Sequence, residues 1–378
     1  MNIGKINQFP AHPLLISFVC TVLTGIAYGF GMYLFPMVMP EMMKDLELSY
    51  PLIAVVSGTA QISPYLAIPL AGFLTYRFGG LKVVVGIQLL GALLLVGYFS
   101  VDSMAGLTVV TFLIRSWPTM TWIPLVSVAS DHIPFNRRGT MLTICSSAAC
   151  FFLFVDGIVS SWFLKFSHWR VMWLAVAAMT LLCCILSWVA IKRARLWQFR
   201  SQRDPEKYTS QRGGISEWMM SRAGMVINGL FLTGGFSFVG FQMYLAAFLR
   251  DELALGLDIT GIMWSVMGIS GIIGGIVLVI ATDRLGARAC MFTVFFLGTL
   301  SSLVVCIFNS NAIYLAMAVA FGLAQAAFYG IGPAYISKVL PRHTASNAFT
   351  IGSMIMVTGS VISNISGGWT QGLTGSFL

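Results

Sequence analysis

Two residues that carry charge lie inside long apolar stretches of the sequence, where a charge is costly. Arg115 stands in Phe-Leu-Ile-Arg-Ser-Trp-Pro, and Asp156 stands in Leu-Phe-Val-Asp-Gly-Ile. At the helical rise of about 1.5 Å per residue, both lie roughly 12–15 Å below the same edge of an apolar layer, so they can meet. They form either a structural ion pair that locks two helices, or a site in which Arg115 binds an anion and Asp156 carries a proton. The sequence supports both interpretations equally.

Several polar side chains in other apolar stretches are candidates for the same substrate and proton site. Each of them, taken alone, is more often a hydrogen-bond partner between helices than a ligand of a solute. Together with Arg115 and Asp156 they make up the predicted site. They are Tyr28, Tyr33, Gln61, Asn228, Gln242, Tyr244, Gln325 and Tyr329.

The composition requires that most side chains face something other than water. Of 378 residues, 57% are hydrophobic and only 9% are charged, and the mean hydropathy is +0.86. One water-soluble core cannot contain so much apolar surface, so the solvent of these side chains is lipid. The seven cysteines lie in or beside apolar runs with no Cys-x-x-Cys pair, which indicates packing residues and neither a disulfide framework nor a zinc site. We expect no metal and no cofactor.

The apolar stretches predict an all-α integral membrane protein with eleven spanning helices. Each stretch is long enough to cross a hydrocarbon layer of about 30 Å. The first is too long for the core of a signal peptide, so it is expected to remain as a helix. The predicted spans are 13–39, 51–76, 81–100, 105–129, 139–164, 169–192, 223–249, 259–282, 288–308, 311–337 and 345–368.

The distribution of charge predicts how the chain crosses the membrane. With a cytoplasmic N-terminus, most of the 22 Lys and Arg residues fall in cytoplasmic segments, which is the bias expected of an inner-membrane protein. Many of them lie in the polar linker 192–222, while most acids fall outside. The net charge of +9 therefore reflects membrane topology, and we expect lipid and no nucleic acid as a partner.

An internal repeat divides the chain. Residues 72–79 and 279–286 carry similar loops after apolar runs, and Met32-Tyr33-Leu34 is echoed by Met243-Tyr244-Leu245. The second loop resembles the signature Gly-x-x-x-Asp-Arg-x-Gly-Arg/Lys of the major facilitator superfamily (MFS), although its leading Gly is absent. The first loop has Tyr76 where that signature has Asp. The resemblance implies a transporter of two six-helix bundles with its site between them.

The repeat gives the expected domains: an N-terminal bundle over 1–191, a cytoplasmic basic linker over 192–222 and a C-terminal bundle over 223–378. The family has twelve helices, and only eleven are predicted here. Residues 368–378 form a polar turn where a twelfth helix would begin. The sequence is therefore expected to be truncated, and the alternative is a protein that works with an incomplete second bundle.

The resemblance also implies gating residues on the cytoplasmic side. Asp131 resembles the acid that the family places opposite the loop arginine, and we expect it to hold Arg77 when this side is closed. Lys338 stands at the matching position of the second half, so the latch is not duplicated. The predicted gating set is Arg77, Gly79, Asp131, Asp283, Arg284, Gly286 and Arg288.

The function predicted from these features is secondary active transport of a small polar solute, an organic anion, by a monomer that is coupled to protons. One alternative is a drug-efflux antiporter, although the Gly- and Pro-rich helix signature of such proteins is missing from 146–161. Another is a non-transporting membrane sensor. An enzyme is not expected. Gly268-Ile269-Ser270-Gly271 matches the Gly-x-Ser-Gly of intramembrane serine proteases, but the sequence has no membrane-embedded His to act as a base for Ser270.

Overall fold

Eleven long helices make up the part of the chain that the structure, a computed structural model, describes: residues 13–194, 220–308, 310–339 and 342–377. No strand occurs in these residues. The first six helices are α1 (Pro13–Tyr28), which continues through the π-helix η1 (Gly29–Tyr33) into α2 (Leu34–Asp45), then α3 (Tyr50–Phe78), α4 (Gly80–Phe99), α5 (Met104–His132), α6 (Phe135–Phe166) and α7 (Trp169–Arg193). The other five are α10 (Arg222–Gly234), which continues through η3 (Gly235–Val239), α11 (Gly240–Ala247) and η4 (Phe248–Glu252), then α12 (Leu257–Leu285), α13 (Ala287–Ile307), α14 (Asn311–Val339) and α15 (Arg342–Thr374).

Ten of these helices are long and apolar enough to cross a membrane. The remaining helix, α5, contains Arg115 and two interior prolines, Pro118 and Pro124, which lower its hydropathy. The all-α membrane fold expected from the sequence is confirmed, and each predicted span coincides with one helix. The protein is therefore a multi-pass membrane protein.

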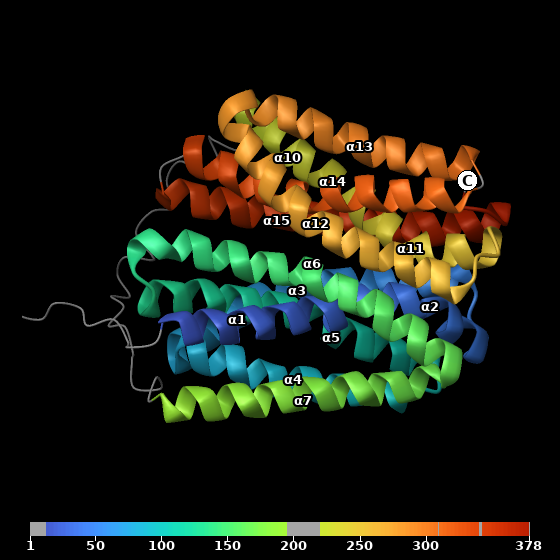
Figure 1. The fold of residues 1–378 in the computed structure, drawn as a ribbon, viewed down its shortest axis with the longest axis horizontal. Helices are drawn as coiled ribbons and strands as arrows, with labels where there is room; N and C mark the ends of the chain where they lie inside the picture. Colours follow the sequence, from blue (N-terminus) through green and yellow to red (C-terminus); the bar gives the residue numbers. More distant parts are fainter. Residues whose placement is uncertain (1–12, 195–219, 309, 340–341, 378) are drawn as a thin grey trace, which may run out of the picture.

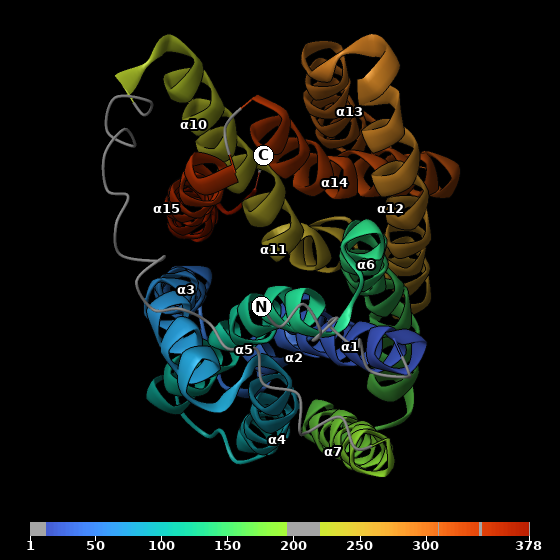
Figure 2. The same cartoon turned by 90° about the vertical axis from the view of Figure 1, so that its left-hand side faces the viewer.

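The helices gather into two groups (Figures 1 and 2), which we call the first bundle (α1–α7) and the second bundle (α10–α15). Three helix pairs make most of the contact between the groups: α6 packs against α12, α3 against α15, and α2 against α11. Within each bundle, corresponding helices pack in the same way: α5 lies against α3 and α4, and α14 lies against α12 and α13. The expected boundary segment, 192–222, lies mostly outside the described residues.

The two repeated loops share one backbone conformation. Gly79 separates α3 from α4 with φ +87°, and Gly286 separates α12 from α13 with φ +81°. A residue with a Cβ pays a steric penalty in this region, so both turns favour glycine. The predicted repeat is thus visible in the geometry as well as in the sequence.

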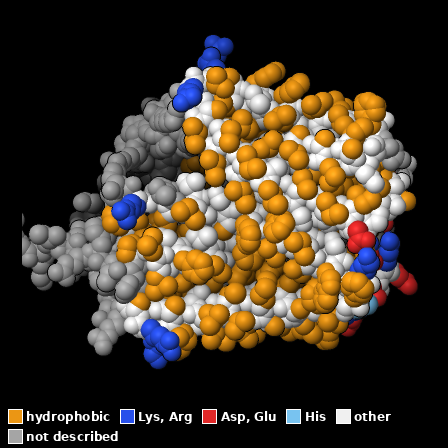
Figure 3. All heavy atoms as spheres, in the orientation of Figure 1, with side chains coloured by type: hydrophobic (Ala, Val, Ile, Leu, Met, Phe, Trp, Pro, Cys, Tyr) orange, Lys and Arg blue, Asp and Glu red, His pale blue; other side chains and the backbone are white. Residues whose placement is uncertain are grey.

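The two ends of the molecule differ in charge. We call the end where α7 ends and α10 begins the linker end, and the opposite end, which holds Glu41, Asp251 and Asp258, the acidic end. In Figure 3 apolar side chains cover most of the surface between them; on this face, separate Lys and Arg side chains lie toward the linker end, and acids lie together with Lys and Arg at the other end. Side chains such as Leu93 and Phe292 are 68% and 73% exposed on this apolar belt, as lipid contact requires.

Candidate functional site

Arg115 reaches from α5 toward the first two helices of the fold. Its Nε donates to Oε1 of Gln61 at 3.2 Å, and its Nη1 donates to the backbone oxygen of Met32 at 3.1 Å. The Met32 carbonyl can accept this bond because the residue four positions later, Pro36, has no N–H to give it. Pro36 thus leaves a backbone acceptor for a charged side chain, next to a π-helix, a conformation that is frequent at functional sites.

Tyrosine side chains from both bundles lie in the neighbourhood of the guanidinium. Tyr33 from η1 and Tyr329 from α14 lie within electrostatic range of Arg115, and Tyr28 lies near Tyr329. Tyr28 and Tyr329 are only half-buried, although both lie in the interior of continuous helical segments, 13–45 and 311–339. We call this set the Arg115 cluster: Arg115, Gln61, Met32, Tyr28, Tyr33 and Tyr329. It brings five of the predicted site residues together at the boundary between the bundles.

Asp156 lies elsewhere on α6, against the start of η1. Its side chain is fully buried, and neither carboxylate oxygen has a hydrogen-bond partner. A Cβ built on Gly29 would come within 3.3 Å of its Oδ2 and within 2.7 Å of Cβ of Phe152, so the helices meet closely here. The prediction that Arg115 and Asp156 meet is wrong for this conformation, because the described contacts of Arg115 are with Gln61 and Met32.

The predicted polar residues of the second bundle form a separate arrangement without charge. Gln325 on α14 donates to Gln242 on α11 at 2.6 Å, and the hydroxyl of Tyr244 donates to the backbone oxygen of Asn364 at 2.5 Å. Asn228 joins neither pair, and its side-chain oxygen has no partner among the described residues. The buried Asn364 was missed at the sequence level, although a polar residue in an apolar run was the available signal.

Ion pairs and hydrogen bonds join the bundles at the acidic end. Arg250 on η4 pairs with Glu41 on α2, and Asp251 contacts Lys44 at 3.4 Å and accepts from the Tyr50 hydroxyl at 2.5 Å. The Arg250 side chain is only 8% exposed. The sequence offered no signal for these pairs, since the partners are about 200 residues apart. We call this set of contacts the acidic-end gate.

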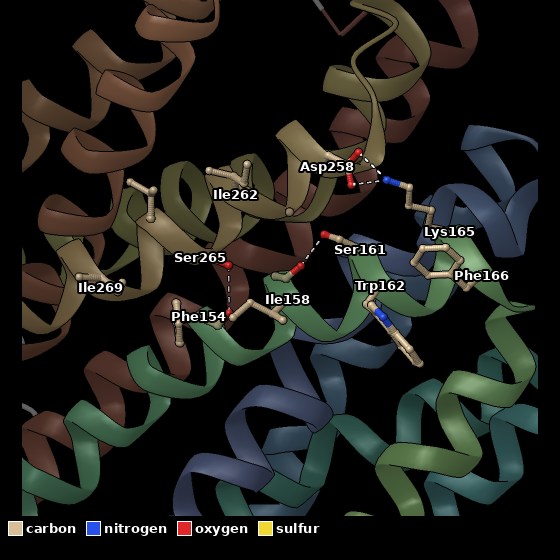
Figure 4. Close-up of a pocket in the computed structure, with 13 residues that line it drawn as sticks. Phe154, Ile158, Ser161, Trp162, Lys165, Phe166, Asp258, Ile262, Ser265 and Ile269 are labelled. Atoms are coloured by element: carbon tan, nitrogen blue, oxygen red, sulfur yellow. Dashed lines mark hydrogen bonds and ion pairs between the residues drawn. The ribbon is translucent and has the colours of Figure 1, made fainter.

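The seam between α6 and α12 is tight at the same end (Figure 4). Gly157 and Gly261 face one another so closely that a Cβ on either would clash with the other's backbone, and Ser265 donates to the Phe154 carbonyl at 3.1 Å. An ion pair between Lys165 and Asp258, 3.0 Å long, lies at the outer edge. Beside the seam is an apolar cavity of about 530 Å³.

The predicted cytoplasmic latch lies at the linker end. Among the described side chains no ion pair joins Arg77 to Asp131: the Arg77 guanidinium lies over the Phe78 ring at 5.6 Å, and Asp131 accepts from Ser127 at 3.3 Å. Arg284 and Arg288 are exposed at this end, and the Asp283 side chain lies outside what the structure describes. The described polar contacts between the bundles all lie between Tyr65 and the acidic end. Tyr65 itself donates a hydrogen bond to the Met354 carbonyl at 2.7 Å.

Comparison with known proteins gives a consistent result. Residues 21–363 match the family model of the Major Facilitator Superfamily. A bacterial homolog of the human lysosomal transporter Spinster, in an inward-facing and unoccupied conformation, superposes with a TM-score of 0.77 at 12% identity, covering 96% of this chain and 83% of that one. A mutant of the nucleoside transporter NupG gives a TM-score of 0.72 at 14% identity, covering 95% and 92%. No curated protein sequence gives a match.

Proposed function

Because the chain belongs to the Major Facilitator Superfamily, we propose that it is a secondary active transporter that moves a small organic anion by alternating access. The observation that carries this proposal is Arg115, a half-buried cation at the bundle boundary whose described partners are a neutral amide and a carbonyl. A guanidinium this deep in an apolar layer is costly without an opposite charge. A carboxylate on the solute supplies that charge and suits the planar, bidentate geometry of arginine.

The tyrosines of the Arg115 cluster favour a solute that touches both bundles. Tyr33 belongs to the first bundle and Tyr329 to the second. The contacts of a solute held between their hydroxyls and Arg115 would therefore change when one bundle moves against the other. Binding between repeats is the general arrangement of such transporters. A cationic drug is disfavoured at this position, because Arg115 would repel it.

We place the linker end in the cytoplasm of a bacterium, following the positive-inside rule for an inner-membrane protein. The acidic-end gate then closes the outer side, and the described conformation faces inward. The separation of Arg77 from Asp131 agrees with the expectation that this latch forms only when the cytoplasmic side closes. The bundles are the units that move, and one chain contains both of them, so a monomer can carry out the transport cycle.

Asp156 is the proposed carrier of the coupling proton. A buried carboxyl without a hydrogen-bond partner is far less costly when it is neutral. Its contact with Gly29 places it beside η1, the same segment that supplies Met32 and Tyr33 to the Arg115 cluster. Gain or loss of the proton would therefore change the charge next to the segment that holds the solute.

An uptake screen tests the proposal. Purified protein in liposomes with an imposed proton gradient would be offered carboxylates, neutral sugars and nucleosides, and cationic drugs, with protein-free liposomes as the control. We expect uptake of at least one carboxylate above the control. Uptake of cations alone would favour the drug-efflux alternative, and uptake of no solute would favour the sensor; either result contradicts the proposal.

A further inference from the structure

The apolar cavity beside the seam of α6 and α12 is a groove on the surface that faces lipid (Figure 4). Gly157 and Gly261 are buried at its floor, where a Cβ on either would clash with the backbone of the opposite helix. Its volume of about 530 Å³ lies within the range of small-ligand sites. Ile158 on α6 and Ile262 on α12 are 53% and 52% exposed, so its walls are open to the membrane. We call it the seam groove.

A pair of opposite charges lies at the outer edge of the seam groove. Lys165 Nζ lies 3.0 Å from Asp258 Oδ2, both side chains are half or more exposed, and both line the groove. Lys165 stands in the last turn of α6 and Asp258 in the first turn of α12. Trp162, which also lines the groove, lies about one turn below Lys165, and tryptophan is enriched at the boundary of a membrane. The charge pair therefore lies at the depth of the lipid head groups.

The two charged groups can each bind a further partner. An ammonium has three N–H donors, and a carboxylate accepts about four hydrogen bonds, so the contact between Lys165 and Asp258 leaves capacity on both. A head group that has a phosphate and a primary amine can place its phosphate on Lys165 and its ammonium on Asp258. The four charges then alternate in sign. A head group with a phosphate and no amine would only add a negative charge beside Asp258.

We propose that the seam groove binds a zwitterionic phospholipid with a primary amine, phosphatidylethanolamine, from the leaflet at the acidic end. The phosphate contacts Lys165, the ammonium contacts Asp258, and an acyl chain lies along Ile158 and Ile262. The trimethylammonium of phosphatidylcholine has no N–H to donate to the carboxylate, and phosphatidylglycerol has no amine. The charge pair thus selects the amine, and the apolar walls select the chain.

The position of the seam groove between the bundles connects the lipid to the acidic-end gate. Its walls come from α6 of the first bundle and α12 of the second, and the charge pair has one member on each. When the bundles separate at this end, the walls part and the head group loses one of its two partners. A ligand that binds one of two states shifts the population toward that state, so the lipid holds the acidic end closed. This effect on the gate rests on the proposed alternating access, whereas the binding itself does not.

Native mass spectrometry of the purified full chain tests the binding by counting bound phosphatidylethanolamine against phosphatidylcholine and phosphatidylglycerol. The variant is Lys165→Gln with Asp258→Asn, which keeps the net charge. The control is Arg170→Gln with Asp102→Asn, which removes an ion pair at the same end within the first bundle. Each exposed ion contact strengthens binding by at most about fivefold, so we expect roughly 2- to 30-fold weaker phosphatidylethanolamine binding in the variant and little change in the control. Equal binding in variant and control, or no preference for phosphatidylethanolamine in the wild type, overturns the proposal.

A second pair of measurements separates a lipid from a soluble ligand. Ile158→Trp fills the apolar part of the groove and leaves both charges in place, so we expect it to weaken phosphatidylethanolamine binding. Leu93→Trp, the control, places the same ring elsewhere on the apolar belt and should have little effect. Soluble phosphoethanolamine, which has the head group but no chains, should not displace the lipid. If it does displace the lipid and Ile158→Trp has no effect, the site recognises a soluble zwitterion and the proposal is wrong.

Liposomes of defined lipid test the effect on the gate. A cysteine placed at Tyr33 should be labelled from the outside more slowly in phosphatidylethanolamine than in phosphatidylcholine, and Lys165→Gln with Asp258→Asn should remove the difference. Equal labelling of the otherwise wild-type protein in the two lipids would overturn the effect on the gate. A protein that binds phosphatidylethanolamine but transports no solute would contradict the proposed function and support the lipid site.

Discussion

The two bundles share a scaffold and differ in the chemistry that they place at its centre. The first bundle holds both deep ionisable side chains, Arg115 and Asp156, whereas the second holds the neutral amide pair of Gln242 and Gln325. At the repeat spacing of the loops, Arg115 corresponds to Gly322, so the charge has no counterpart. A repeated backbone thus fixes helix packing and loop conformation, while the side chains that bind a solute are free to differ. We expect charge recognition to come from the first bundle.

The largest expected effect concerns Asp156. We predict that Asp156→Asn abolishes proton-driven accumulation while exchange of solute across a balanced gradient continues, because the amide keeps the shape but cannot release a proton. Since the carboxyl has no described partner to lose, folding should be little affected. Accumulation and exchange in liposomes measure the two activities separately. Ser363→Ala, at the matching position of the second bundle, is the control, and unchanged accumulation in Asp156→Asn would remove the residue from the coupling mechanism.

The acidic-end gate gives the next effect. Arg250→Ala leaves Glu41 without its partner, and the loss of a largely buried pair is expected to cost about 1–3 kcal/mol, reduced because Glu41 is partly exposed. This cost shifts the population toward the outward-open state by roughly 5- to 150-fold, measured as labelling of a cysteine placed at Tyr33 from the outside.

Arg170→Ala is the matched control for the gate, because Arg170 pairs with Asp45 and Asp102 inside the first bundle. Its loss removes a similar arginine without loosening contact between bundles. If Arg170→Ala raises labelling as much as Arg250→Ala does, the effect is general destabilisation and the gate assignment is wrong.

The amide pair of the second bundle should have a smaller, structural effect. Gln325→Leu leaves the buried amide of Gln242 unpaired, so we expect a loss of about 1–3 kcal/mol of stability, seen as a lower melting temperature. The double change Gln242→Leu with Gln325→Leu should recover most of it. A double variant as unstable as the single one would contradict a purely structural role of the hydrogen bond. A double variant that loses solute binding as completely as an Arg115 variant would show that both bundles supply recognition.

The smallest expected effect compares the repeated turns. Gly79→Ala and Gly286→Ala each place a Cβ at positive φ, which should cost about 1 kcal/mol in each bundle. Thermal unfolding of the two variants in the same detergent gives the comparison. Costs that differ severalfold would indicate that one turn has a role beyond its backbone conformation.

Features that follow from local chemistry were predictable from the sequence. Apolar stretches predicted the helices, and the repeated glycine loops predicted the two halves. The pairing of Arg115 with Asp156 failed, because helical rise gives depth but not the direction in which a side chain points around its helix. The acceptor at Met32 depends on a carbonyl freed by Pro36, and the gate contacts join residues about 200 positions apart. Pro36 is visible in the sequence but does not show which donor reaches the freed carbonyl, and contacts between residues so far apart leave no signal in one sequence read on its own.

The most direct test of the account is the affinity of the protein for a carboxylate with and without the Arg115 guanidinium. Calorimetry on detergent-solubilised protein, with the carboxylate that gives the highest uptake, compares the wild type with Arg115→Lys and Arg115→Gln. The account predicts roughly 10- to 100-fold weaker binding for Arg115→Gln, since hydrogen bonds to a charged group contribute about 1.5–3 kcal/mol, and an intermediate loss for Arg115→Lys. Wild-type affinity in a correctly folded Arg115→Gln protein would contradict it.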